Sequence, residues 1–120
     1  MSSAFVIHLH AGHGPAHYDL MLQRGDALAT WRLERPPAEL KAGESMAAKK
    51  LPDHRVEYLT YEGPVSKGRG QVKMFDRGQC ETAFASDARW EILFHGRAMQ
   101  GKYELRHIVG DEWELRKLPT

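Results

Sequence analysis

The sequence predicts an all-β fold, a small antiparallel β-barrel of about eight strands with one or two short helical turns. Short apolar stretches alternate with turn residues about every eight to twelve positions, a spacing typical of all-β chains. The chain has 120 residues, 42% of them hydrophobic and 28% charged, which is enough for one core but too few for two domains. We therefore expect a single domain over residues 1–120, with a sheet that closes on itself.

The first half of the chain contains three strands, predicted from alternating apolar residues and the turns between them. They are residues 5–10, 17–23 and 27–33, joined by the Gly-rich loop 11–16 and the turn at Gly25-Asp26. Pro36-Pro37 ends the third strand, because proline cannot donate to a strand ladder. A helical turn or two is predicted at residues 44–50, after Gly43.

The second half of the chain supplies the remaining predicted strands. Residues 54–62 form a short extended segment that ends at Gly63-Pro64, and residues 71–75 alternate as a strand closed by a turn at 76–78. Three further strands follow at residues 90–94, 101–107 and 113–117. The connections between them carry glycine, which adopts the backbone angles that tight turns require.

Charge and composition exclude several classes of protein. Seventeen Lys and Arg against sixteen Asp and Glu give a net charge of +1, so no strong field draws the whole molecule to nucleic acid, although a local patch near Lys49-Lys50 or Arg69 is possible. No apolar run approaches the roughly 20 residues that span a bilayer, so we expect no membrane partner. The single cysteine, Cys80, excludes a disulfide framework. We expect it to pack rather than react, in a reducing cytoplasm.

The histidines are the most unusual feature, because four of the seven fall within ten positions. In a strand, residues two apart share a face, so His8 and His10 share one face of the first strand, and His17 and Asp19 share one face of the second. If the apolar residues of both strands face one core, these side chains converge on the opposite face. Imidazoles with a carboxylate suit a divalent metal ion. The alternative is that they are solvated or cap the hairpin. We expect His13, in the Gly-rich loop, to be exposed and not to be a ligand.

Four groups of residues occur in an order that resembles a known family. They are Phe5-Val6-Ile7 and His10 with His17-Tyr18-Asp19; Asp53-His54-Arg55-Val56-Glu57-Tyr58 with Tyr61-Glu62-Gly63; Gly68-Arg69-Gly70-Gln71-Val72 with Phe75-Asp76-Arg77-Gly78; and Phe94-His95-Gly96-Arg97 with Gly101-Lys102-Tyr103-Glu104-Leu105 and Trp113-Glu114-Leu115. Together they resemble the 3′-phosphoesterase domain family of bacterial DNA ligase D over roughly residues 5 to 117. This chain would be a stand-alone member.

The resemblance implies a compact β-barrel that binds manganese or a similar divalent ion. It also implies an enzyme that trims the 3′ ends of DNA primers by removing a terminal ribonucleoside and then a 3′-phosphate. By position, the resemblance assigns His10, His17 and Asp19 as metal ligands, His8 as a further candidate beside them, and His54, Tyr58 and Arg35 as the catalytic residues that contact phosphate. Protonated imidazole, phenol and guanidinium groups all donate to phosphate oxygens.

Two positions depart from the family pattern. The family places an arginine two residues after the metal-binding aspartate, where this chain has Met21, and a second arginine aligns near Met46. A thioether cannot replace the paired donors of a guanidinium. Metal binding should survive these changes better than phosphoester cleavage.

The leading interpretation is a metal-dependent phosphoesterase that acts on 3′ ends of nucleic acid in DNA repair. One alternative is a catalytically weak or inactive relative that binds a divalent metal or a phosphate ligand. Another is a DNA-repair interaction module that binds a DNA ligase or end-joining proteins. Manganese is the cofactor expected from the resemblance, with zinc as the alternative, because imidazole and carboxylate ligands accept both ions. The substrate can be DNA, RNA or a small nucleotide.

Overall fold

A single antiparallel sheet closes on itself, because β1 pairs with β2 along one edge and with β6 along the other. The computed structural model describes residues 2–119. Its strands are β1 (Ser2–Ala11), β2 (His17–Arg24), β3 (Ala27–Leu33), β4 (Ser45–Arg55), β5 (Gly63–Pro64), β6 (Gln71–Ala85), β7 (Arg89–Gly96), β8 (Gln100–Val109) and β9 (Glu112–Lys117). Eight of them form the barrel in the order β1-β2-β3-β4-β9-β8-β7-β6, and β5 pairs only with β6. The predicted all-β barrel is confirmed.

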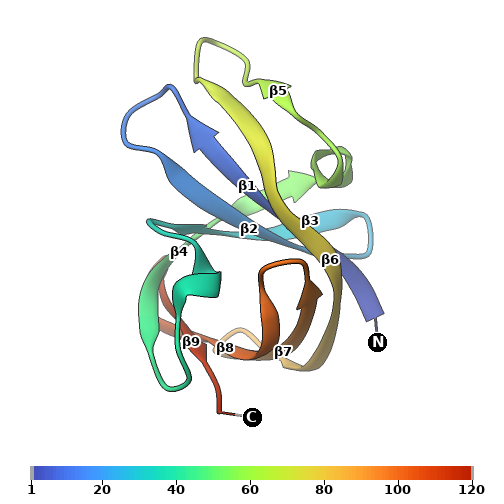
Figure 1. Ribbon diagram of the computed structural model, residues 1–120, viewed down its shortest axis with the longest axis vertical. Coiled ribbons are helices and arrows are strands. Elements are labelled where there is room, and N and C mark those ends of the chain that lie inside the picture. Colours follow the sequence, from blue (N-terminus) through green and yellow to red (C-terminus); the bar gives the residue numbers. More distant parts are fainter. Residues whose placement is uncertain (1, 120) are drawn as a thin grey trace.

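The long strand β6 joins β1 to β7 and so closes the barrel. Its first part pairs with β1 and its last part with β7, and Figure 1 shows it running along most of the molecule. Two short 3₁₀ turns, η1 (Pro37–Glu39) and η2 (Val56–Leu59), are the helical elements among the described residues. Within residues 2–119 no helix has the length and apolarity needed to cross a membrane.

The barrel interior holds one large apolar core. The core takes alternate residues from its strands, among them Phe5, Ile7, Leu20, Leu22, Trp31, Leu33, Ile92, Phe94, Tyr103, Leu105 and Leu115. The Trp31 ring packs edge-on against Trp90 and Trp113, with centroids 5.1 and 5.5 Å apart. Cys80 is also buried there, and burial raises the pKa of its thiol. A neutral buried thiol is inert, so the prediction that Cys80 packs is in keeping with its position.

Three predicted segments were wrong. Residues 44–50 are not helical but belong to β4, which pairs with β3 and with β9; this pairing on both edges closes the barrel and overrides local preference. Residues 54–62 are not a single extended segment, because β4 ends at Arg55 and η2 follows. Residues 76–78 are not a turn, since β6 continues to Ala85. Gly78 lies where a Cβ would be 2.3 Å from the His95 carbonyl oxygen, so close strand approach, not a turn, requires this glycine.

A β-bulge in β4 decides the direction of His54. Leu28 of β3 lies opposite His54, whereas Thr30 lies opposite Leu51, so two steps on β3 face three on β4. Opposite residues of an antiparallel pair point to the same face. The extra residue therefore turns both Leu51 and His54 onto the outer face of the barrel, as bulges beside functional sites do.

A second bulge, in β6, turns Asp76 inward. Ile7 lies opposite Asp76 and His8 opposite Met74, which leaves Phe75 as the extra residue. The Asp76 side chain is only 3% exposed. Its carboxylate accepts hydrogen bonds from the backbone N–H groups of Arg77, Arg97, Ala98 and Met99, at 2.8, 2.8, 3.2 and 2.7 Å. This carboxylate therefore holds the β7–β8 turn closed.

We predict that Asp76→Ala destabilises the fold by about 2–4 kcal/mol, because it leaves several backbone donors without their acceptor. Urea denaturation measures the loss. Asp87→Ala is the matched control, since Asp87 lies exposed in the bend between β6 and β7. Equal stability of the two variants would contradict the assigned role of Asp76.

Candidate metal centre

The register of the β1–β2 hairpin brings the predicted polar residues to one face. His8 lies opposite Asp19 and His10 lies opposite His17. Their chain neighbours Ile7 and Leu20 belong to the interior core. Because side chains alternate along a strand, the histidines and the aspartate lie on the outer face of the barrel, as the alternation predicts.

This outer face is covered rather than open. It carries a small apolar cluster of Val6, Met21 and Leu28, against which Val56, Tyr58, Leu59 and Met74 pack. Figure 1 shows η2 following the end of β4 close to β1 and β3. The cover leaves His8 and Asp19 only 1% and 5% exposed. The site is therefore a partly dry recess between the barrel wall and the segment that contains η2.

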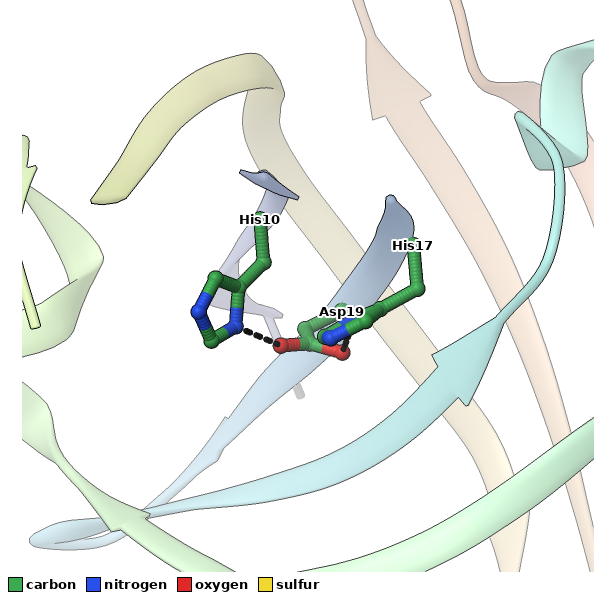
Figure 2. Close-up of side chains that lie close together, drawn as sticks. All are labelled: His10, His17 and Asp19. Carbon is green, nitrogen blue, oxygen red and sulfur yellow. Dashed lines mark hydrogen bonds and ion pairs between the residues drawn. The ribbon is translucent and has the colours of Figure 1, made fainter. Parts of the chain in front are cut away.

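The structure brings His10, His17 and Asp19 together in this recess (Figure 2). One possible ligand atom from each residue lies within 4.8 Å of the others. His17 Nδ1 is 2.9 Å from Asp19 Oδ1 and donates to it. His10 Nδ1 lies 3.9 Å from Asp19 Oδ2. We define these three residues as the triad.

The Arg69 carbonyl decides which nitrogen of His10 faces the triad. His10 Nε2 lies 2.5 Å from this oxygen. A carbonyl oxygen only accepts hydrogen bonds, so Nε2 carries the proton and Nδ1 keeps its lone pair toward Asp19. A histidine that donates its second N–H to a backbone carbonyl is typical of metal ligands, because the bond fixes both tautomer and ring orientation.

Burial favours the neutral imidazoles of His17 and His8. Burial lowers the pKa of His17, an effect that Asp19 opposes and Arg32 reinforces. Burial also lowers the pKa of His8, whose Nε2 has no hydrogen-bond partner among the described residues. A metal ion binds the neutral form of imidazole. His8 therefore has the right form, but it is not part of the triad.

The triad fits a divalent metal ion. Two imidazoles and one carboxylate give three protein ligands, the number that catalytic sites use when they keep a position open. Adjacent ligand atoms of a tetrahedral site with bonds near 2.1 Å lie about 3.4 Å apart, within the range that the triad spans. Nitrogen and oxygen donors of this kind accept manganese and zinc alike.

A cavity of about 420 Å³ opens beside the triad. His8, His10, Asp19, His54 and Tyr58 line it, so the structure brings five of the predicted site residues to one space. The His54 Nδ1 atom donates to the Pro52 carbonyl at 3.0 Å, which leaves Nε2 available. The rings of His54 and Tyr58 meet edge-on with centroids 5.7 Å apart.

The arginines that line the cavity are not the one that the sequence predicts. Arg35 lies exposed in the bend after β3 and does not line the cavity. Arg32, Arg55 and Arg69 do line it, and none of them was among the predicted catalytic or metal-binding residues. A signal for Arg32 existed: the tight turn at Gly25-Asp26 sets the β2–β3 register, which places Arg32 opposite Asp19.

The loop that carries Arg69 gives a test of the triad. Gly70 has φ +80°, and a Cβ there would lie 2.1 Å from the Ala11 carbonyl oxygen. Gly68 has φ +67° and open space around it. We predict that Gly70→Ala weakens Mn²⁺ binding about 10- to 100-fold, because it displaces the Arg69 carbonyl that orients His10.

Gly68→Ala is the matched control, since it carries similar backbone strain without the collision. Isothermal titration calorimetry measures both affinities, and thermal melts confirm that both variants fold. Equal affinity of the two variants would contradict the role of the Arg69 carbonyl.

The family model described as the DNA ligase D 3′-phosphoesterase domain matches residues 8–107. The chain is similar to the multifunctional non-homologous end joining protein LigD of Mycobacterium bovis, at 33% identity over 123 residues, covering 97% of this chain. It is also similar to the protein of that name from Mycolicibacterium smegmatis, at 31% identity over 128 residues and 95% of this chain. The matched part is 16% of the length of each relative. The chain therefore belongs to the DNA ligase D 3′-phosphoesterase domain family.

Proposed function

We propose that this domain is a divalent-metal-dependent phosphoesterase that acts on 3′ ends of nucleic acid in DNA end-joining repair. The observation that carries the proposal is the triad of His10, His17 and Asp19 beside a cavity that His54 and Tyr58 also line. Family membership supports the reaction class. The names of the relatives, non-homologous end joining proteins, support the role in end joining.

Each residue of the site has a distinct role in this proposal. The triad would hold the ion, which as a Lewis acid would polarise a phosphoryl oxygen and activate water. In its protonated form His54 would donate from Nε2 to a phosphate oxygen or to the leaving group, while Nδ1–H stays bonded to the Pro52 carbonyl. The Tyr58 hydroxyl would supply a second donor. Arg35 lies outside the cavity, so its proposed contribution is attraction of the bound strand.

The covered recess matters for this chemistry. A buried carboxylate and desolvated imidazoles act in a low-dielectric space, where they hold a cation more strongly than they would in water. The cavity beside them is open enough to admit a terminal phosphate. Ion and phosphate would therefore meet between the barrel wall and the segment that contains η2.

A second candidate function, binding without turnover, is favoured by Met21. Its side chain is buried and lines the cavity, yet it offers no hydrogen-bond donor. Met46 is partly buried against the interior core and lies outside this cavity. A module that binds a DNA ligase or another end-joining protein is the third candidate, and it predicts complex formation that does not depend on the triad.

We predict Mn²⁺-dependent removal of phosphate from a DNA primer that carries a 3′-phosphate. His10→Ala and Asp19→Ala should lower the rate at least 100-fold, because each removes one of three ligands. His13→Ala is the matched control, since His13 is exposed in the β1–β2 loop. Electrophoresis of the end-labelled primer, with and without EDTA, measures the product.

Turnover that persists in EDTA or in His10→Ala would exclude the triad as the active site. Mn²⁺-dependent thermal stabilisation with no product would favour the binding module. Repeating the assay with Zn²⁺ identifies the ion that supports turnover.

His54→Ala and Tyr58→Phe test the phosphate side of the cavity. We predict that His54→Ala lowers kcat about 100-fold, because one positioned proton donor contributes roughly this factor. Tyr58→Phe keeps the ring that packs on His8 and His54 and should lower kcat by a smaller factor. Mn²⁺ affinity, measured by calorimetry, should stay within about twofold for both variants. A parallel loss of Mn²⁺ affinity would show that they act on the metal site instead.

A further inference from the structure

The side chain of Arg32 reaches both the triad and the cavity. Arg32 lies opposite Asp19 across the β2–β3 pair. Its Nε is 3.8 Å from Asp19 Oδ1, too far for a hydrogen bond but close enough for an ion pair. The side chain is 41% exposed and lines the cavity. The guanidinium therefore has one side toward a buried acid and the other toward open space.

The Arg32 Nε atom is a buried donor without an acceptor. Among residues 2–119 it has no hydrogen-bond partner, although it is shielded from solvent. Buried donors in native proteins are normally paired, and each exception needs an explanation. An acceptor that enters the cavity would supply the missing partner. Phosphate oxygens, like those of a carboxylate, match the planar fork of a guanidinium.

The other two arginines around the cavity differ from Arg32, because one is hydrogen-bonded within its own loop and the other lies in solvent. Arg69 donates to the Ser66 carbonyl from Nε at 2.9 Å and to the Ser66 hydroxyl from a terminal nitrogen at 3.0 Å. Arg55 pairs with Glu57 in solvent at 3.8 Å. Met21, the neighbour of Asp19 along this face, donates nothing. Among the arginines of the described cavity wall, Arg32 is thus the one with a buried donor that lacks a partner and with an ion pair to the triad.

We propose that Arg32 is the phosphate-binding guanidinium of this cavity and that it exchanges its ion pair with Asp19 for the phosphate when a metal ion binds the triad. The proposal rests on the proposed function for the identity of the cavity, and it adds the residue that recognises the anion. A cation bound to Asp19 neutralises the negative charge that attracts Arg32 to that carboxylate. The released positive charge and the bound ion then attract the same phosphate.

This exchange predicts effects of opposite sign on the two ligands. Arg32 repels a metal ion, so Arg32→Ala should bind Mn²⁺ about two- to fivefold more tightly. The same variant should bind inorganic phosphate at least tenfold more weakly in the presence of Mn²⁺. Arg32→Lys keeps the positive charge but loses the forked donors of the guanidinium. Its Mn²⁺ affinity should match that of the wild type. Its phosphate affinity should fall between those of the wild type and Arg32→Ala.

Isothermal titration calorimetry with Mn²⁺ alone, and then with inorganic phosphate on the Mn²⁺-loaded protein, measures these affinities. Arg116→Ala is the matched control, because it removes the same charge from an exposed position on β9. Thermal melts of each variant confirm folding. Neither titration depends on turnover.

Tighter Mn²⁺ with weaker phosphate in Arg32→Ala supports the proposal. Weaker binding of both ligands would show that Arg32 only holds Asp19 in place and would overturn it, as would unchanged phosphate affinity. If the domain releases no phosphate from DNA but these opposite shifts occur, the proposed function fails and the inference about Arg32 stands. If the domain releases phosphate from DNA but Arg32→Ala keeps the phosphate affinity of the wild type, the proposed function stands and the inference about Arg32 fails.

Discussion

The register between β1 and β2 decides what this barrel carries on its outer face. Pairing His10 with His17 and His8 with Asp19 places the polar residues of both strands together, while Ile7 and Leu20 enter the core. A slip of one residue would exchange the two sets and put the imidazoles into the apolar interior. The same alternation that stabilises the barrel therefore also builds the triad.

A face with the right residues is not yet a site, and three further features complete it. The bulge in β4 turns His54 to the outer face. The segment that contains η2 packs on the face, and burial there favours the neutral imidazole of His8. The Arg69 carbonyl fixes the ring of His10. These features come from the end of β4 and from the segment that follows it, which lies outside the eight barrel strands up to Arg69.

Much of the fold was predictable because apolar and polar residues alternate along a strand that has one buried face. This alternation located the strands that contain His10, Asp19 and Trp31 and the convergence of the triad residues. β4 was missed because its pairing with two neighbouring strands decides its structure, and no local residue preference signals that. The continuation of β6 past Phe75 was missed for a related reason: a bulge breaks the alternation that marks a strand. Arg32 was overlooked in favour of Arg35, although hairpin register alone places it opposite Asp19.

The central claim is that His10, His17 and Asp19 bind one divalent ion on the outer face of the barrel. The most direct measurement is an anomalous difference map from crystals grown with manganese, collected at the manganese absorption edge. The account predicts one strong peak bonded to an imidazole nitrogen of each histidine and to a carboxylate oxygen of Asp19. A peak on other residues, or none on these three at saturating manganese, would contradict it.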